Sequence, residues 1–457
     1  MSFVLSPASS PSLPISLATS LPDALHYQQK QQQQQLYLEE HALSTLVQQH
    51  GTPAYVYSRS AIIQAYTAHA QAFASEKHLI CYAVKANSNL SVLKLLADLG
   101  AGFDIVSYGE LARVLAAGGT PDKVVFSGVG KTAHEIRQAL ATGIKCFNAE
   151  SVAELGLIHE IALDMGKKAP VSIRINPDVD AGTHPYISTG LKENKFGIPA
   201  AEALSVYRYA RQLSGMAVQG IDCHIGSQIL NIAVYADAVR AVAAVVRQLE
   251  ADGIQLHHIN FGGGLGITYD QEQAADPQQL YQLILHTLEQ ELPDAQKYQL
   301  IFEPGRSITG NAGVLLTRVL FTKKNGDREF AIVDAAMNDL LRPSLYQAQH
   351  RVIPCVIPLP KKQPQQKEAD HLCTYDIVGP VCETGDYLAK NCRMHPVHPG
   401  DILAVLGAGA YGFVMASNYN SRPRAIEIMV SGARHAVVRE REQIADLICQ
   451  EHVVTDF

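Results

Sequence analysis

A lysine, a glutamate and a histidine stand at the ends of short apolar runs, and together these side chains could work on an aldehyde cofactor. Lys85 ends the run CYAVK, Glu303 ends QLIFE, and His224 follows GIDC. Burial weakens the preference of a lysine for its charged form, so a neutral amine at Lys85 could condense with an aldehyde. A carboxylate at Glu303 could keep a pyridine nitrogen protonated, and His224 could stack on the ring. Taken singly, such a lysine is more often a solvated rim residue and such a histidine is as often structural.

Four glycines belong to the same pattern and could hold a phosphate. Gly262, Gly263 and Gly264 follow the run HHINF, and Gly305 lies two residues after Glu303. Glycine lets backbone N–H groups approach an anion closely, and the N-terminus of a following helix adds a positive dipole. An isolated run of three glycines more often makes only a tight turn. In company with the lysine and the glutamate, these glycines favour a pyridine cofactor that carries a phosphate.

Eight short β-rich runs, each followed by a helical pattern, would bring these residues together. The alternation extends over about 230 residues and favours a (β/α)8 TIM-like barrel over an open sheet. In such a barrel the working residues lie at the C-terminal ends of the strands, and phosphate often binds after strands seven and eight. We therefore expect Asp104, Ser227 and Arg306 at the same mouth as Lys85. The predicted strands are 78–85, 103–107, 123–128, 145–150, 171–177, 220–226, 257–263 and 299–304.

The pattern changes on both sides of this barrel, which we place at residues 54–310. Residues 311–457 contain strands with little helix and predict a second, mainly β C-terminal domain. Residues 36–53 form a segment that joins this β domain. Residues 1–35 are rich in serine and proline and end in a glutamine tract. Such a tail buries too little apolar surface to offset its conformational entropy, so we expect it to be disordered.

Composition excludes several classes of function. A net charge of -7 offers no basic surface for nucleic acid. The eight cysteines are scattered, without a C-x-x-C pair or a spacing that predicts a zinc site, so no metal is expected. No apolar run approaches the roughly 18 residues of a membrane span, and no basic region precedes an apolar stretch as in a secretory signal. These features predict a cytoplasmic protein with reduced thiols and no membrane partner.

Nine blocks of sequence, in this order, resemble the fold-type III pyridoxal-phosphate-dependent decarboxylases. The resemblance spans about residues 50–430, and single blocks are weaker signals than nine in register. The blocks KENKFG, LRPSLY and CETGD resemble in particular the diaminopimelate branch of the family. The nine blocks are YAVKAN (82–87), FDIVSYGE (103–110), HPYISTGLKENKFGI (184–198), HIGSQI (224–229), FGGGLGI (261–267), EPGR (303–306), LRPSLY (341–346), CETGD (382–386) and YGFVMASNYNSRPR (411–424).

The resemblance implies roles for individual residues. Lys85 would carry pyridoxal 5'-phosphate covalently, with His224 stacked on the ring and Glu303 at the pyridine nitrogen. Cys382 would donate the proton that replaces carbon dioxide. The resemblance also implies an amino-acid substrate, and a head-to-tail homodimer with shared active sites. Cofactor-binding residues would include Asp104, Ser227, Gly262, Gly263, Gly264, Gly305, Arg306 and Tyr411, and Arg306, Arg342, Tyr346, Glu383 and Tyr411 would bind substrate.

Other interpretations compete with this one. The segment LGAGAYG contains G-x-G-x-x-G at Gly407, Gly409 and Gly412, with Glu427 farther on, as in a dinucleotide-binding protein. That motif needs a helix directly after its last glycine, whereas FVMASNYNSRPR contains asparagines and a proline. Within the resemblance, the runner-up is a decarboxylase of ornithine, lysine or arginine. A non-catalytic homologue that binds pyridoxal phosphate is the remaining alternative, and the presence of Lys85, Glu303 and Cys382 argues against it.

Overall fold

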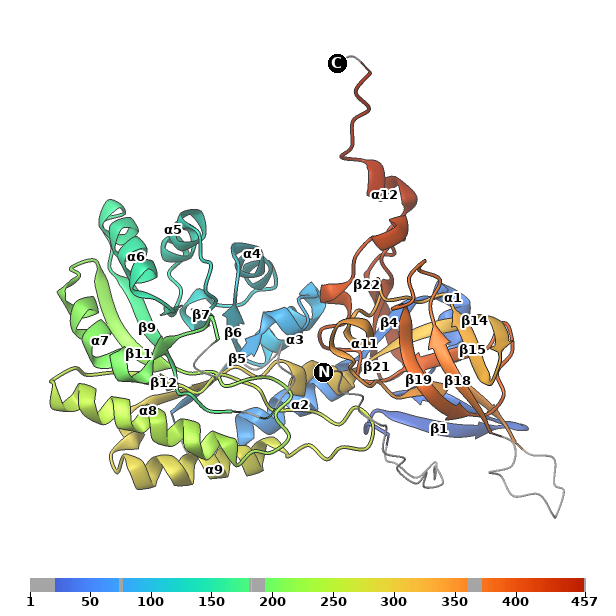
Figure 1. Ribbon diagram of the computed structural model, residues 1–457, viewed down its shortest axis with the longest axis horizontal. Coiled ribbons are helices and arrows are strands. Elements are labelled where there is room, and N and C mark those ends of the chain that lie inside the picture. The colour runs from blue at the N-terminus through green and yellow to red at the C-terminus, as the bar shows by residue number, and fades with distance from the viewer. Residues whose placement is uncertain (1–20, 74–76, 181, 183–193, 360–371, 456–457) are drawn as a thin grey trace, which may run out of the picture.

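The chain forms a β/α barrel and a second, sheet-rich domain that lie side by side (Figure 1). The computed structural model describes residues 21–73, 77–180, 182, 194–359 and 372–455. The barrel holds the predicted lysine and glycine residues, and the second domain contributes loops that approach them. The N-terminal and C-terminal parts of the described chain both belong to the second domain.

Eight parallel strands close the barrel, in the order that the sequence predicts. Each strand pairs with the next, β8 pairs with β9, and β13 pairs with β5, so the sheet has no free edge between them. Their bounds lie within a few residues of the predicted ones. The strands are β5 (His78–Ala83), β6 (Gly102–Ile105), β7 (Val124–Phe126), β8 (Cys146–Ala149), β9 (Ala169–Asn176), β11 (Met216–Asp222), β12 (His258–Asn260) and β13 (Gln299–Phe302). A two-residue strand, β10 (Ile198–Pro199), pairs with β9.

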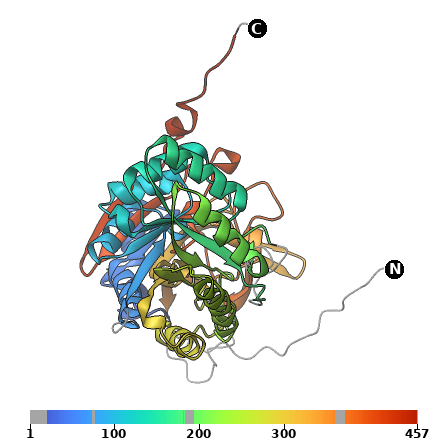
Figure 2. The same cartoon turned by 90° about the vertical axis from the view of Figure 1, so that its left-hand side faces the viewer.

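Helices surround these strands (Figure 2). Several begin at a side chain that accepts a backbone N–H, such as Ser107, Thr132 and Asp276. Such a cap satisfies a helix-end amide and fixes where the chain leaves the barrel mouth. The helices of this domain are α2 (Arg59–Gln71), α3 (Leu90–Asp98), α4 (Tyr108–Ala116), α5 (Ala133–Thr142), α6 (Val152–Asp164), α7 (Ala203–Gln212), α8 (Val234–Ala251), α9 (Pro277–Glu291) and α10 (Arg306–Thr309).

The second domain is built on a mixed sheet with the order β19-β18-β15-β14-β4-β21-β22. Residues 54–58, which lie inside the bounds that we predicted for the barrel, form a strand that pairs with β14 and β21 in this sheet. Its buried Tyr55 and Tyr57 pack there, so the barrel begins after it. The strands are β4 (Ala54–Ser58), β14 (Gly313–Asn325), β15 (Arg328–Val333), β18 (Cys373–Val378), β19 (Tyr387–Met394), β21 (Ile426–Ser431) and β22 (Arg434–Arg439), with β20 (Ile402–Val405) beside β14 and β16 (Val352–Pro354) beside β20. Two short helices, α11 (Arg342–Tyr346) and α12 (Ile444–Ile448), complete it.

The predicted disorder of residues 1–35 is wrong for the part that the structure describes. Strands β1 (Leu25–Lys30) and β2 (Gln33–Leu38) form an antiparallel hairpin, and β17 (Val356–Pro358) and β3 (His41–Ala42) pair with β2. The glutamines of the tract hydrogen-bond through their backbone, while Leu25, Leu36 and Leu38 bury apolar surface beside α1 (Leu43–His50). Residues 1–20 lie outside the described residues.

The described residues contain no helix long and apolar enough to cross a membrane. They also contain no group of three histidine, cysteine or acidic side chains that could hold a metal ion.

Candidate active site

Lys85 lies directly after β5, in the short 3₁₀ helix η1 (Val84–Ala86), and forms an ion pair with Asp104 of β6. The Lys85 side chain is 37% exposed, so a ligand can reach it, whereas Asp104 is fully buried. The second oxygen of Asp104, Oδ1, has no hydrogen-bond partner among the residues that the structure describes. A buried acceptor without a partner is costly, and a ligand with a donor at this point would remove that cost.

The protonation state of Lys85 differs from our expectation. Burial lowers the pKa of the Lys85 ammonium, but Asp104, Tyr411 and Glu303 outweigh burial and raise it above the ordinary value. In the protein by itself Lys85 is therefore charged. The prediction of a lowered pKa was wrong because it considered burial without the adjacent carboxylates.

Glu303 follows β13 and is buried, with hydrogen bonds on one side of its carboxyl group. Asn260 and Asn148 both donate to Glu303 Oε1, at 2.6 and 3.4 Å. Burial raises the pKa of Glu303 well above its usual range, and repulsion from Asp104 and Asp222 adds to the rise. A carboxyl group in this state has a proton to share with a basic ring nitrogen.

The three glycines after β12 form a turn in which a side chain would not fit. A Cβ atom at Gly263 would lie 2.1 Å from the Glu303 carbonyl oxygen, and one at Gly264 would lie 2.4 Å from the Gly226 carbonyl oxygen. Gly262 and Gly264 also have positive φ angles, 65° and 110°. The amides of Ser227, Gly264 and Gly305 have no acceptor among the described residues. These three N–H groups suit a phosphate.

His224 follows β11 and meets the glycine turn. The Gly263 amide donates to His224 Nδ1 at 3.2 Å, so the ring proton sits on Nε2. Burial lowers the pKa of His224 well below its usual range, and the charges of Arg174 and Lys85 lower it further. A neutral ring in this position could stack on a flat cofactor, as the sequence suggested.

Arg306 and Arg342 are buried cations without an acidic partner in the described part of the chain. Arg306 donates to Ser227 Oγ at 3.1 Å and to the Tyr269 hydroxyl, and Arg342 hydrogen-bonds His350 Nε2 at 2.9 Å. Both guanidinium groups also lie over the Tyr269 ring. The Nε atom of each arginine has no partner, and neither arginine forms an ion pair among the described residues. Among the described residues, these arginines therefore do not serve as partners in structural salt bridges.

Tyr411 connects the second domain to the lysine segment. Its amide donates to the Ala86 carbonyl at 2.8 Å, and the Arg306 guanidinium lies 4.7 Å above its ring centre. Its φ angle of 55° is uncommon for a residue with a side chain. Tyr346, at the end of α11, is partly buried and lies close enough to Arg342 to influence its pKa.

The G-x-G-x-x-G segment is a domain junction. The Asn87 side chain donates to the Gly409 carbonyl oxygen at 3.0 Å. A 3₁₀ helix of three residues, η8 (Phe413–Met415), follows in place of a long helix. Glu427 is buried in β21 and accepts from Tyr57. The dinucleotide-binding alternative is therefore wrong.

Cys382 and Glu383 are exposed. Among the described residues, no hydrogen bond or ion pair joins them to the lysine cluster of the same chain, by which we mean Lys85, Asp104, His224 and Glu303. The Cys382 amide donates to Asn420, and the Tyr419 hydroxyl donates to Glu383 at 3.0 Å. Most of the block HPYISTGLKENKFGI, through residue 193, lies outside the described residues.

Sequence reasoning missed a buried charge network that acts on His224, since the charge of Arg174 lowers the pKa of His224. Arg174 of β9 bonds Glu150 at 3.1 Å and lies 3.9 Å from Asp222. It also missed Asn260, Tyr269 and His350, which hydrogen-bond Glu303, Arg306 and Arg342 respectively. The available signal was the strict alternation of VSIRIN in β9, which places Arg174 on the same strand face as Ser172 and Asn176.

Together these groups fit pyridoxal phosphate: a reachable lysine, a protonated carboxyl, free amides at a glycine turn and an unpaired aspartate oxygen. The family described as "Pyridoxal-dependent decarboxylase, pyridoxal binding domain" matches residues 59–310. The chain is thus a pyridoxal-dependent decarboxylase by class.

Comparison with individual proteins narrows this class. Diaminopimelate decarboxylase of Vibrio cholerae is 51% identical over 94% of this chain and 100% of that protein. The enzyme of Pseudomonas aeruginosa is 52% identical over 92% of this chain and 97% of that protein. The solved structure of diaminopimelate decarboxylase from Helicobacter pylori, complexed with L-lysine, matches with a TM-score of 0.83 and 45% identity over 89% of this chain and 98% of that one. This chain belongs to the diaminopimelate decarboxylase family.

Proposed function

We propose that the chain converts meso-2,6-diaminopimelate to L-lysine and carbon dioxide, the last step of lysine biosynthesis, with pyridoxal phosphate bound at Lys85. The observation that carries the substrate assignment is the pair of buried arginines, Arg306 and Arg342, which lack an acidic partner. Two unpaired cations beside a cofactor lysine favour a substrate that brings a second carboxylate.

Each residue of the site has a separate role in the proposed reaction. Bound pyridoxal phosphate supplies a protonated pyridine ring that spreads the negative charge left on the α-carbon when carbon dioxide departs. Glu303 holds the proton of the ring nitrogen, and His224 and the glycine turn fix the position of the ring and phosphate. The thiol of Cys382 returns a proton to the α-carbon.

The distal end of the substrate determines the choice among amino acids. Diaminopimelate carries an ammonium and a carboxylate there, whereas lysine and ornithine carry only the ammonium. Arg306 and Arg342 can hold the carboxylate with paired N–H donors, Tyr346 can add a hydrogen bond, and Glu383 can take the ammonium. With lysine as substrate, the arginines would stay buried and unpaired.

Comparing kcat/KM across substrates tests this assignment. We expect meso-diaminopimelate to exceed lysine, ornithine and arginine by at least about 100-fold, or about 2.7 kcal/mol. Arg342→Ala should reduce this difference in kcat/KM, because it should lower the value for diaminopimelate more than the values for the other substrates. Comparable efficiency on lysine or ornithine would favour the polyamine-type alternative, and no turnover despite bound cofactor would favour a non-catalytic homologue.

The exposed Cys382 and Glu383 support a head-to-tail homodimer with shared sites. In our proposal they reach the barrel mouth of the neighbouring subunit, so two-fold symmetry gives two identical sites. All eight cysteines are free thiols, which supports a place in the reducing cytoplasm.

Subunit exchange tests the shared site. Lys85→Ala and Cys382→Ala proteins should each be inactive, and mixing them under conditions that exchange subunits should restore part of the activity. Heterodimers without recovered activity would mean that each site is built within one chain.

A further inference from the structure

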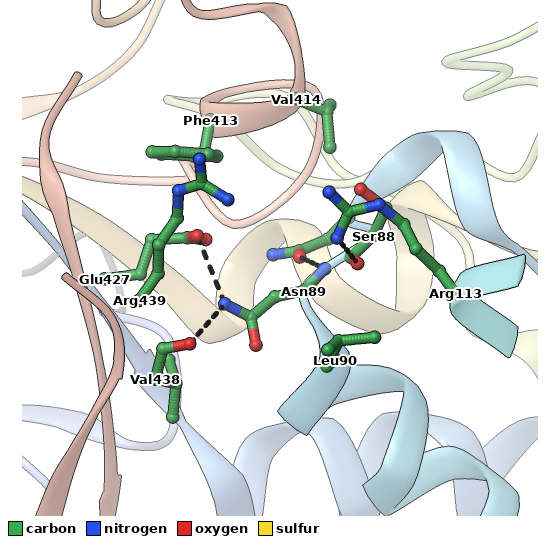
Figure 3. Close-up of a pocket in the computed structure, with 10 residues that line it drawn as sticks. Ser88, Asn89, Leu90, Arg113, Phe413, Val414, Glu427, Val438 and Arg439 are labelled. Atoms are coloured by element: carbon green, nitrogen blue, oxygen red, sulfur yellow. Dashed lines mark hydrogen bonds between the residues drawn. The ribbon is translucent and has the colours of Figure 1, made fainter. Parts of the chain in front are cut away.

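A second pocket, separate from the lysine cluster, lies where the barrel meets the second domain (Figure 3). Its cavity volume is about 100 Å³. The barrel contributes the segment that leads into α3, together with Arg113 of α4. The second domain contributes η8, Glu427 of β21 and Arg439 of β22. A group bound here would touch both domains.

The strongest acceptors in this pocket already have donors. Glu427 Oε1 accepts from the Tyr57 hydroxyl at 2.7 Å, and its Oε2 accepts from Asn89 Nδ2 at 3.1 Å. Asn89 Oδ1 caps α3 by accepting from Ser91 N at 2.9 Å. The carbonyl oxygen of Ser88 accepts from Arg113 Nη1 at 3.1 Å. A cationic ligand would find little free acceptor capacity.

The unused hydrogen-bonding capacity belongs to donors. Arg439 Nε is buried without a partner among the described residues, and Arg439 Nη2 forms an ion pair with Glu442 at 3.9 Å, too far for a hydrogen bond. Within the described parts of the chain, the Arg113 side chain makes a single hydrogen bond, through Nη1. Glu427 lies between the two guanidinium groups, but its two oxygens are already satisfied, and Glu442, the other carboxylate near Arg439, is bonded to Arg424. Donors without acceptors favour a ligand that brings acceptor oxygens, such as an anion.

The remaining walls are apolar and set the size of the ligand. The Arg439 guanidinium lies 4.9 Å above the Phe413 ring centre, and Leu90, Val414 and Val438 complete the lining. A cavity of this volume holds more than one water molecule but no large metabolite. A carboxylate on a short aliphatic chain matches both the donors and the walls.

We propose that this junction pocket binds a small aliphatic carboxylate, which Arg113 of the barrel and Arg439 of the second domain hold between them. The site goes beyond the proposed decarboxylation and uses none of its residues. It is linked to the active site, because Asn87 in its wall donates to the Gly409 carbonyl oxygen, two residues before Tyr411. A ligand that joins the two domains stabilises this junction.

Thermal unfolding of the holoenzyme tests the proposal with sodium butyrate as the probe. The unfolding midpoint in butyrate should exceed that in sodium chloride at equal ionic strength, and the increase should saturate with butyrate concentration. Butylammonium chloride should give no such increase. Acetate should act more weakly, because it leaves the apolar walls uncovered. Equal effects of butyrate and chloride, or of butyrate and butylammonium, would overturn the assignment of a carboxylate site.

Variants locate the ligand. Arg439→Gln should raise the apparent Kd for butyrate about tenfold, the usual cost of losing a hydrogen bond to a charged group. Arg113→Gln should raise the Kd by a similar factor, and it replaces Arg439→Gln in the test if that variant folds poorly. Arg434→Gln, an exposed arginine on the same strand, is the matched control and should leave the Kd unchanged. Arg342→Ala should also leave it unchanged. If Arg342→Ala abolishes the response and Arg439→Gln preserves it, butyrate binds in the substrate site and the proposal is wrong.

Discussion

The buried arginines of the described residues differ in what neutralises their charge. Arg174 forms one group by itself, and Arg306 and Arg342 form the other. Arg174 in the barrel interior is bonded to Glu150 and faces Asp222. Arg306 and Arg342, at the mouth, are as deeply buried but have hydroxyl, imidazole and ring partners and no carboxylate among the described residues. The charge of Arg174 is neutralised within the fold, whereas Arg306 and Arg342 need an anion from a bound ligand.

The difference teaches how to separate structural charge from functional charge. A buried cation without a counter-charge lowers stability, so a fold retains it where a ligand supplies the missing charge. Burial lowers the pKa of Arg342, and the neighbouring Arg306 lowers it further, whereas Glu150 and Asp222 overcome burial and raise the pKa of Arg174. The same residue type is thus held in two opposite electrostatic states.

The largest expected effect is on stability, from Arg174→Met. This change leaves Glu150 and Asp222 buried without their cation, which should lower the free energy of unfolding by about 3–5 kcal/mol. Urea unfolding of the cofactor-free protein measures it. The exposed pair of Arg137 and Asp164 provides the control, because Arg137→Met should cost less than about 1 kcal/mol. A similar small cost at Arg174 would show that its network is not a structural unit.

The same substitution at the mouth, Arg342→Met, should act on activity and not on stability. It removes a buried cation that has no acidic partner, so the free energy of unfolding of the cofactor-free protein should change by less than about 1 kcal/mol. The kcat/KM for meso-diaminopimelate should fall by about 100-fold, because the distal carboxylate loses a paired contact. A loss of stability as large as that of Arg174→Met would remove the distinction between the two groups.

The smallest expected effects are on pH dependence, and they have opposite signs in the two regions. Burial and the charge of Arg342 lower the pKa of His350 to about 3. The unfolded chain therefore binds the extra proton, and wild-type stability falls as pH drops from about 6.5 toward 3. Burial raises the pKa of Asp222 to about 7 against the opposing charge of Arg174. There the folded chain binds the extra proton, and stability falls as pH rises from about 4 toward 7.

Unfolding measurements between about pH 4 and 8 check both signs. Relative to wild type, His350→Gln should gain stability as the pH falls, and Asp222→Asn should gain stability as the pH rises. Slopes of the same sign in the two variants would contradict the assigned protonation states.

Much of this arrangement could be predicted from the sequence, because a barrel converts strand ends into neighbours. Once eight strands were recognised, Lys85, Asp104 and Glu303 were expected at one mouth. The structure confirms the strands and shows Lys85 in contact with Asp104. The glycine turn followed from its place after the seventh strand. These predictions needed only local patterns and one rule of topology.

What could not be predicted depends on contacts between distant segments. The hairpin at residues 25–38 forms because leucines next to a glutamine tract find apolar partners in the second domain, and no local pattern shows those partners. The raised pKa of Lys85 depends on which carboxylates surround it. The network of Arg174 joins strands that are far apart in sequence. The roles of Cys382 and Glu383 remain predictions, since they depend on a neighbouring subunit.

Borohydride reduction of the purified protein, after recording its absorption spectrum, tests the central claim most directly. We predict a bound pyridoxal chromophore and, after reduction and peptide mapping, a pyridoxyl group on the peptide that contains Lys85. Lys131, a buried lysine paired with Glu154, should stay unlabelled, and Lys85→Ala protein should carry no label. A label on another lysine, or bound cofactor that reduction fails to attach to any peptide, would contradict the assignment of Lys85.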